Sequence, residues 1–323
     1  MMILNNKITI LKKAKGYFKR TKNKWSMTVI IKSHRTLRPL VQWALILALF
    51  GVQSTVLAVE SAIIDSESRS HPVHGSLGMV VSQEIVASRV GADILSQGGN
   101  AIDAAVATGF ALAVTLPRAG NLAGGGFMLV HLAEEKKTIA LDYREMAPAS
   151  ASRDMFLKPN GEVDNQLARD SIKSSGVPGT VAGLLYAHEK YGRLSLKQVI
   201  QPAIHLASEG ISVSVDLSYS LKSRATRLRE NPATSRYFFR EDGAFYEPGD
   251  TLVQSDLADT MRRIVANGRS GFYQGKTAQL IIDEMERSGG LLSFDDLKNY
   301  RVVERAPVCV DFKENEICSM PPP

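Results

Sequence analysis

The chain has 323 residues, of which 44% are apolar and 22% charged, which is ordinary for a globular protein and enough for one large domain or two small ones. The net charge of +6 comes from eleven Lys and Arg in residues 1–40; removing these from the 39 basic residues leaves 28 against 33 acidic ones. Because the rest of the chain is mildly acidic, its charge gives no support for nucleic-acid binding.

The N-terminal residues have the pattern of an export signal. The basic stretch is followed by the uncharged residues 41–59, with an apolar centre at 43–52 and a β-branched and a small residue, Val56 and Ala58, at the −3 and −1 positions of a cleavage site. This order predicts a signal peptide with a long basic n-region over residues 1–58, for which Met27 is an alternative start. An uncleaved membrane anchor is the alternative, because nineteen uncharged residues nearly span a bilayer. We expect a periplasmic or secreted protein, free of the membrane after cleavage.

Two helices are expected early in the exported part, after a lead-in loop and a short strand over residues 79–82. The first helix covers 84–97 and buries one apolar stripe. The second covers 101–116, with Asn100 as its N-cap and Asp103 in its first turn. It is apolar on almost all sides and rich in Ala, so it should be buried on more than one face.

A glycine-rich segment at 120–126 precedes a predicted hairpin with strands at 127–132 and 138–143. The segment lacks the Lys-Ser/Thr pair of a phosphate-binding loop and leads into a strand rather than a helix. It therefore indicates a turn and close backbone packing.

Arg144 follows the second strand of this hairpin, at a sheet end. An arginine fork suits a carboxylate, which it can hold with two hydrogen bonds. The residues alone favour a structural ion pair of Arg144 with Glu145 or Asp142, and a binding role is the alternative.

Residues 148–175 are expected to be irregular, and residues 237–250 a loop or short hairpin with core aromatics at Phe238, Phe239, Phe245 and Tyr246. Asp295 and Asp296 have the position of helix-start residues. Helices are predicted over 176–191, 196–209, 216–230, 254–267, 275–288 and 293–300, followed by a hairpin over 302–321.

The two cysteines, Cys309 and Cys318, flank a predicted hairpin turn at 314–315. With that turn they are diagonal neighbours, roughly 7–8 Å apart, which is long for a disulfide. The register thus favours free cysteines. A disulfide, which an exported protein can form, is the alternative. His71 and His74 are expected to be a surface pair. Because no Cys/His spacing typical of a metal site occurs, no metal or cofactor is predicted.

Six stretches resemble one enzyme family. They are GGNAIDAAVA at 98–107, AGNLAGGGFMLV at 119–130, DYREMAPA at 142–149, PGTVAG at 178–183, GDTLVQ at 249–254 and SMPPP at 319–323. In these motifs residues 71–323 resemble the γ-glutamyltranspeptidase (glutathione hydrolase) family. The resemblance implies an α/β fold, the αββα sandwich of N-terminal-nucleophile hydrolases, with residues 59–323 as part of the large subunit.

The resemblance also implies a mechanism. Family members are exported as proenzymes that cut themselves, and the new N-terminal Thr of the small subunit attacks glutathione or another γ-glutamyl donor. Water, an amino acid or a peptide then takes the γ-glutamyl group. The arginine of the DYREMAP motif, here Arg144, binds the α-carboxylate of that group.

The chain departs from the family pattern after SMPPP, where the sequence given stops. The Thr nucleophile is expected in a small subunit from the same proenzyme, so no catalytic residue is assigned here; Thr180 and Thr251 match other family positions. An inactive remnant and a related acylase are the alternative functions. A sandwich without its remaining strands should leave apolar sheet surface or a strand edge uncovered.

Overall fold

A computed structural model describes residues 74–323, which form a unit of their own. The predicted signal peptide, its alternative start and His71 lie outside the described residues. Among the helices that are described, none combines the length and the apolar character needed to cross a membrane.

Local capping fixes the first two helices where the sequence predicts them. Helix α2 spans Ile85–Ser96, and the Glu84 side chain accepts a hydrogen bond from its first turn. Helix α3 spans Ala101–Thr115 and begins with a complete capping box, in which the side chains of Asn100 and Asp103 each accept a hydrogen bond from the other's backbone amide. The predicted burial of α3 on several faces is confirmed.

The predicted strand at 79–82 is wrong. These residues are not assigned to a strand and lead directly into α2. Val80 packs against the helical core, where a Cβ on Gly91 would lie 2.8 Å from its Cγ1. A strand needs a ladder partner, and no strand of the described residues supplies one.

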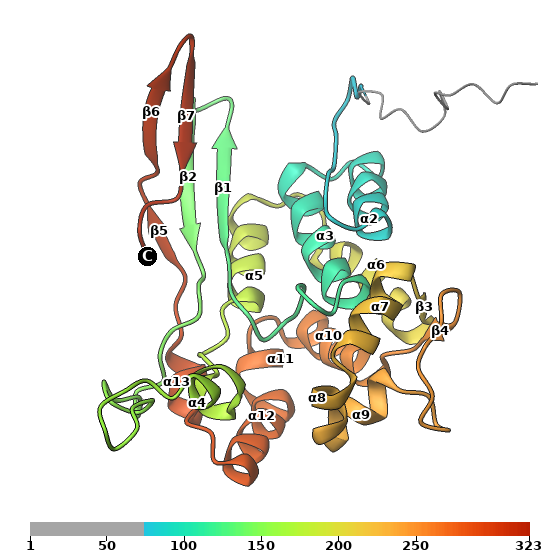
Figure 1. Cartoon of the computed structure of the whole chain (residues 1–323). Helices are drawn as coiled ribbons and strands as arrows, with labels where there is room; N and C mark the ends of the chain where they lie inside the picture. The colour runs from blue at the N-terminus through green and yellow to red at the C-terminus, as the bar shows by residue number, and fades with distance from the viewer. Residues whose placement is uncertain (1–73) are drawn as a thin grey trace, which may run out of the picture. The chain divides into compact units, whose positions relative to one another are not determined.

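Helix α3 is the centre of the helical part (Figure 1). It packs against α2, α5 (Thr180–Tyr191) and α6 (Leu196–Glu209), and α6 packs in turn against α10 (Ser255–Asn267). The buried carboxylate of Asp103 also accepts hydrogen bonds from the amides of the α5–α6 turn. The other helices are α4 (Asn165–Asp170), η2 (Ile172–Ser174), α7 (Val215–Ser223), α8 (Ala225–Glu230), α9 (Pro232–Phe238), α11 (Ser270–Tyr273), α12 (Gly275–Ser288) and α13 (Phe294–Asn299).

Several of these elements differ from the sequence prediction: α4 and η2 lie in the segment that was expected to be irregular, and α11 was not predicted. The single helix expected over 216–230 is interrupted at Arg224, whose backbone leaves the helical conformation without a nearby Gly or Pro. Helix α9 lies mostly at 232–236, where no element was predicted, and only its last two residues fall in the expected loop. Of the four expected core aromatics, Phe239 is buried, and the Arg229 guanidinium lies over its ring at 4.5 Å.

An antiparallel sheet in the order β1–β2–β5 lies beside α5 (Figure 1). Strand β1 (Phe127–Leu132) and strand β2 (Lys137–Asp142) form the predicted hairpin. Strand β5 (Val303–Arg305) pairs with the end of β2. The last four residues of β2 are buried, so the strand that leads to Arg144 has a fixed position in the core. A short second ladder joins β3 (Ile211–Ser212) to β4 (Thr251–Leu252).

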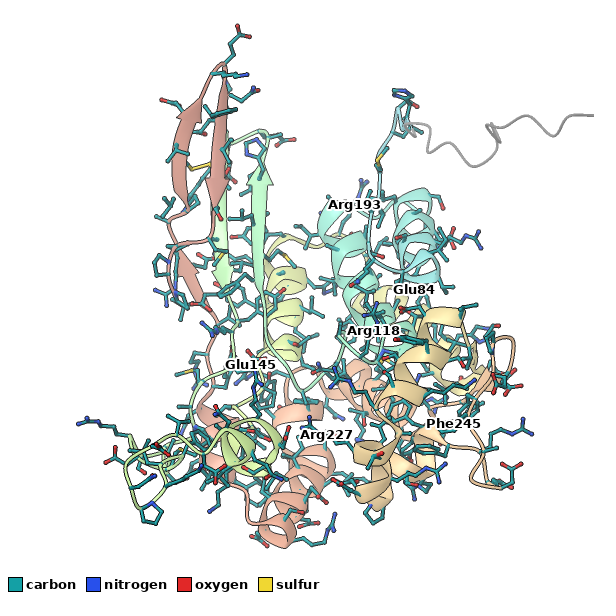
Figure 2. The ribbon with its side chains drawn as sticks, viewed as in Figure 1. Glu84, Arg118, Glu145, Arg193, Arg227 and Phe245 are labelled. Carbon is teal, nitrogen blue, oxygen red and sulfur yellow. A yellow bond between two sulfur atoms is a disulfide. The ribbon has the colours of Figure 1, made fainter. Side chains whose placement is uncertain are left out.

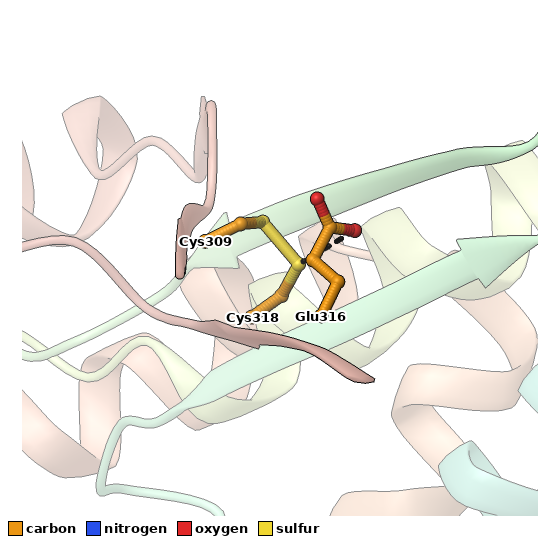
Figure 3. A group of neighbouring side chains, drawn as sticks. All are labelled: Cys309, Glu316 and Cys318. Carbon is orange, nitrogen blue, oxygen red and sulfur yellow. Dashed lines mark hydrogen bonds between the residues drawn. A yellow bond between two sulfur atoms is a disulfide. The ribbon is translucent and has the colours of Figure 1, made fainter. Parts of the chain in front are cut away.

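The C-terminal hairpin, β6 (Val308–Phe312) and β7 (Asn315–Ser319), corrects the cysteine prediction. Its ladder pairs Phe312 with Asn315, so the turn lies at 313–314, one residue earlier than expected. Lys313 takes a left-handed conformation there, with φ of 55°. The shift places Cys309 directly opposite Cys318, and the two form a disulfide (Figure 3).

The other face of this hairpin is apolar and uncovered. Val308, Val310, Phe312 and Ile317 are each exposed by 50–58%. Alternation along the strands puts these four on the face opposite the disulfide. This confirms the expectation that apolar sheet surface is left uncovered.

Candidate functional site

Tyr143 fixes the position from which the chain leaves the sheet. Its amide and carbonyl exchange hydrogen bonds of 3.1 and 3.2 Å with the backbone of Gly126. The buried ring packs on α5 at Gly183, where a Cβ would overlap it, and its hydroxyl donates to the Phe127 carbonyl at 3.2 Å. Burial raises the pKa of Tyr143 to about 12. The residue before Arg144 is therefore held by sheet and helix together.

The glycine-rich segment connects the sheet to α5. The Gly124 carbonyl accepts hydrogen bonds from the amides of Gly179 and Thr180 at 2.7 and 2.9 Å, at the start of the helix. A Cβ on Gly179 would overlap the carbonyl oxygen of Tyr143 and the hydroxyl of Tyr300. The segment thus provides close backbone packing, as the sequence predicts.

The backbone of Arg144 is held on both sides. Its amide donates to Asp142 Oδ1 at 3.1 Å, and its carbonyl accepts from the Tyr300 hydroxyl at 2.8 Å. Burial, with Tyr273 and the carboxylates of Asp142 and Glu145 nearby, raises the pKa of Tyr300 above its ordinary value, so this donor keeps its proton. Figure 2 labels Glu145, the next residue, where the chain leaves β2.

The ion pair favoured for Arg144 from the residues alone is wrong. The other oxygen of Asp142 accepts from Arg305 Nε at 2.8 Å, across the β2–β5 pair. The exposed Arg144 forms no ion pair with a carboxylate of the described residues, Glu145 included. Sequence reasoning missed Arg305, and no local signal could reveal a partner 163 positions away. The side chain of Arg144 is therefore available to a ligand.

Arg144 lies between two pockets, each of which it lines. One, of about 360 Å³, also contains Asp142, Tyr300, Arg301 and Arg305. The other, of about 350 Å³, lies on the side of residues 146–176. Arg144 is thus placed to hold an anionic group at the border of the two pockets, with one pocket on each side of that group.

The segment after Arg144 is held by α13. Asp296 caps that helix through Ser293, as its predicted role requires, and its Oδ1 also accepts from the Ala149 amide at 2.9 Å. Burial raises the pKa of Asp296, but the hydrogen bonds from Ser293 and Ala149 outweigh it and leave the pKa below its ordinary value. A charged carboxylate therefore anchors the DYREMAPA stretch.

Another pocket, of about 610 Å³, lies along α7 and α8. Two of its arginines, Arg118 and Arg227 (Figure 2), pair with Asp216 and Asp170 at 3.0 and 2.7 Å. The charges of these two arginines are already balanced, whereas Arg224, which also lines the pocket, has no ion pair with the described residues. The volume of this pocket does not by itself make it the better anion site.

One group of side chains in the described residues has the composition of a metal site: Cys309, Glu316 and Cys318 (Figure 3). Because the two sulfurs are bonded to each other, they are not thiolate ligands in this state.

Comparison with known proteins identifies the family. The family model for gamma-glutamyltranspeptidase matches residues 87–323. The glutathione hydrolase proenzyme of Escherichia coli strain K12 is 47% identical over 253 residues, which are 78% of this chain and 43% of that protein. The Acylase ACY 1 proenzyme of Pseudomonas strain V22 is 37% identical over 267 residues, 81% of this chain and 48% of that protein.

A solved structure agrees with these sequence matches. The gamma-glutamyltranspeptidase of Helicobacter pylori superposes with a TM-score of 0.76 at 43% identity, over 78% of this chain and 72% of that one. The predicted N-terminal-nucleophile hydrolase fold is confirmed by this likeness, although the chain spans less than half the length of the E. coli relative. The chain belongs to the gamma-glutamyltranspeptidase family.

Proposed function

We propose that residues 59–323 form the large-subunit part of an exported enzyme that takes the γ-glutamyl group from glutathione and related donors. Water or the amine of an amino acid or peptide receives the group. The family membership and the glutathione hydrolase relatives support this proposal. The basic and apolar N-terminal pattern supports export to the periplasm or beyond.

Arg144 carries the proposal. It is an exposed guanidinium that has no carboxylate partner among residues 74–323, and it lies at the end of a buried strand between two pockets. In the proposed role it binds the α-carboxylate of the γ-glutamyl group through two parallel hydrogen bonds. Binding the α-carboxylate also holds the γ-carbonyl in position for attack, because the bound substrate has already lost its translational and rotational freedom before the reaction begins.

The reacting hydroxyl is assigned to a Thr at the start of a small subunit from the same precursor. Its α-amino group takes the hydroxyl proton as the oxygen attacks the γ-carbonyl, and the amide nitrogen leaves with a proton. Water or an acceptor amine then attacks the ester, which restores the hydroxyl. In this scheme the described chain contributes substrate binding, and the small subunit contributes the covalent step.

A hybrid precursor tests the proposal. Residues 71–323 replace the matched 253-residue segment of the E. coli glutathione hydrolase proenzyme. We expect this hybrid precursor to cleave itself into two subunits and to hydrolyse γ-glutamyl-p-nitroanilide. Residues 59–323 alone are the control and should give no turnover above a blank, because the proposed nucleophile lies in the other subunit.

The outcomes separate the alternatives. Self-cleavage without hydrolysis of any γ-glutamyl substrate, but with cleavage of acyl-amide side chains of β-lactams, would favour the acylase reading, which the relative at 37% identity suggests. Soluble precursor with no activity of either kind would favour an inactive remnant. Turnover by residues 59–323 alone would contradict the assignment of the nucleophile.

A further inference from the structure

The pocket on the side of residues 146–176 has a composition of its own. We name it the methionine pocket; its lining includes Met146, Met155, Phe156, Lys173 and Gly176, with Arg144 at its border. Three of these side chains are large and apolar, and the glycine leaves room. Lys173 and Arg144 are cations and Glu145, which also lines the pocket, is an anion, so the lining keeps one net positive charge. The combination suits a small ligand that carries both an apolar group and a negative charge.

The walls of the methionine pocket are joined by the backbone. Met146 and Val177 form an antiparallel bridge, with hydrogen bonds of 3.3 and 2.8 Å. A Cβ on Gly176 would lie 2.8 Å from the Cβ of Glu145, so the two walls approach closely at this point. The anchor from Asp296 to Ala149 holds the far end of one wall. The pocket is therefore formed before any ligand arrives.

The apolar side chains of the pocket are available for contact. Met146 is 53% exposed, an unusual amount for a methionine next to a buried strand, while Met155 and Phe156 are half-buried. Methionine adapts its shape to varied partners, so this surface can accept apolar groups of different size.

Lys173 supplies the charge. It follows the start of η2, it is exposed, and it forms no ion pair with the described residues. The nearby Ser174 hydroxyl donates to the Ser171 carbonyl at 2.6 Å, which fixes the turn that carries Lys173. The ammonium group is thus free to attract a carboxylate in the pocket.

We propose that the methionine pocket binds the group on the other side of the γ-glutamyl amide. This inference rests on the proposed function. Glutathione has two carboxylates: Arg144 holds the one on the glutamyl residue, and Lys173 attracts the one at the glycine end. The apolar lining contacts the side chain of the residue between them, or that of an incoming acceptor.

One pocket serves both leaving group and acceptor because the reaction is symmetrical about the acyl carbon. In the first half, the C–N bond of the donor amide breaks and its nitrogen gains a proton. In the second half, the acceptor nitrogen loses a proton as its C–N bond forms at the same carbon. The acceptor amine therefore enters where the leaving amine departed, and both groups meet the methionine pocket.

The test compares two donors in the hybrid precursor. Glutathione has a carboxylate on its leaving group, whereas γ-glutamyl-p-nitroanilide has none. Lys173→Gln should raise the ratio of KM for glutathione to KM for the anilide by roughly fivefold to tenfold, the range for losing one partly exposed charged contact. Lys158→Gln, at another exposed lysine of the same segment that does not line the pocket, should leave this ratio unchanged.

A second variant tests the apolar lining. Met155→Ala should reduce the preference for methionine or phenylalanine over glycine as acceptor, measured as the ratio of transfer rates. A ratio of KM values that Lys173→Gln does not change, or that Lys158→Gln changes equally, would overturn the proposal. Absence of hydrolysis of both donors by the unmodified hybrid precursor would instead refute the proposed function on which it rests.

Discussion

Replacing Arg144 by alanine should remove most of the preference for donors that carry an α-carboxylate. Loss of one partner of a buried charge pair costs on the order of 2–5 kcal/mol. Because the guanidinium is exposed in the described chain, we take the lower end, about 2 kcal/mol, which corresponds to roughly a 30-fold rise in KM. The KM of Arg144→Lys should lie between that of the unmodified enzyme and that of Arg144→Ala. An ammonium keeps the positive charge but cannot form the two parallel hydrogen bonds of a guanidinium.

A matched pair of donors isolates this contact. γ-Glutamyl-p-nitroanilide has the α-carboxylate, and 4-aminobutyryl-p-nitroanilide keeps the amine and lacks only the carboxylate. In the hybrid precursor we expect Arg144→Ala to lower kcat/KM for the first donor and to leave that for the second nearly unchanged. Arg153→Ala, at an exposed arginine outside both pockets, is the control. An equal loss on both donors would show that Arg144 is structural, and no loss on either would remove it from the site.

Three further predictions concern stability and covalent structure. Because the pKa of Tyr143 is raised, its contribution to the free energy of unfolding is complete below pH 10 and falls as the pH rises towards 12, by about 1.4 kcal/mol per pH unit. Tyr143→Phe should flatten this decline when the free energy is measured by urea unfolding at each pH. An identical decline in the variant would contradict the burial argument. Gly183→Ala, although favourable for a helix, should lower the free energy of unfolding by roughly 1–3 kcal/mol because the new methyl overlaps the Tyr143 ring; an unchanged or higher stability would contradict that packing. Trypsin cleavage after Lys313 should release the C-terminal peptide only after reduction, since Cys309 is bonded to Cys318; release without a reductant would exclude the bond.

Local patterns predicted much of the fold. Asn100 and Asp103 mark the start of α3 because a capping box lies within four consecutive residues. The β1–β2 hairpin follows from two apolar runs around a charged turn, so the position of Arg144 at a strand end was predictable too. Its role as a carboxylate ligand stays a prediction, carried by the family resemblance rather than by the residues alone.

The predictions that were wrong depended on partners far along the chain or on the register of a hairpin. The carboxylate of Asp142 is paired with Arg305, and no local spacing indicates an arginine that far along the chain. The disulfide was missed because a one-residue error in the turn changes which residues face each other across a hairpin. The break at Arg224 has no Gly or Pro to mark it, so no local signal predicted it.

The pairing of β2 with β5 has a consequence for the order of synthesis. When a ribosome has made the chain only through β2, the edge of that strand is open and the carboxylate of Asp142 has no cation. Both are satisfied after about 160 further residues have been added, when Arg305 emerges. Such non-local pairing forms late and slowly. The backbone around Arg144 is therefore among the last parts of this chain to be completed, although its own residues are made early.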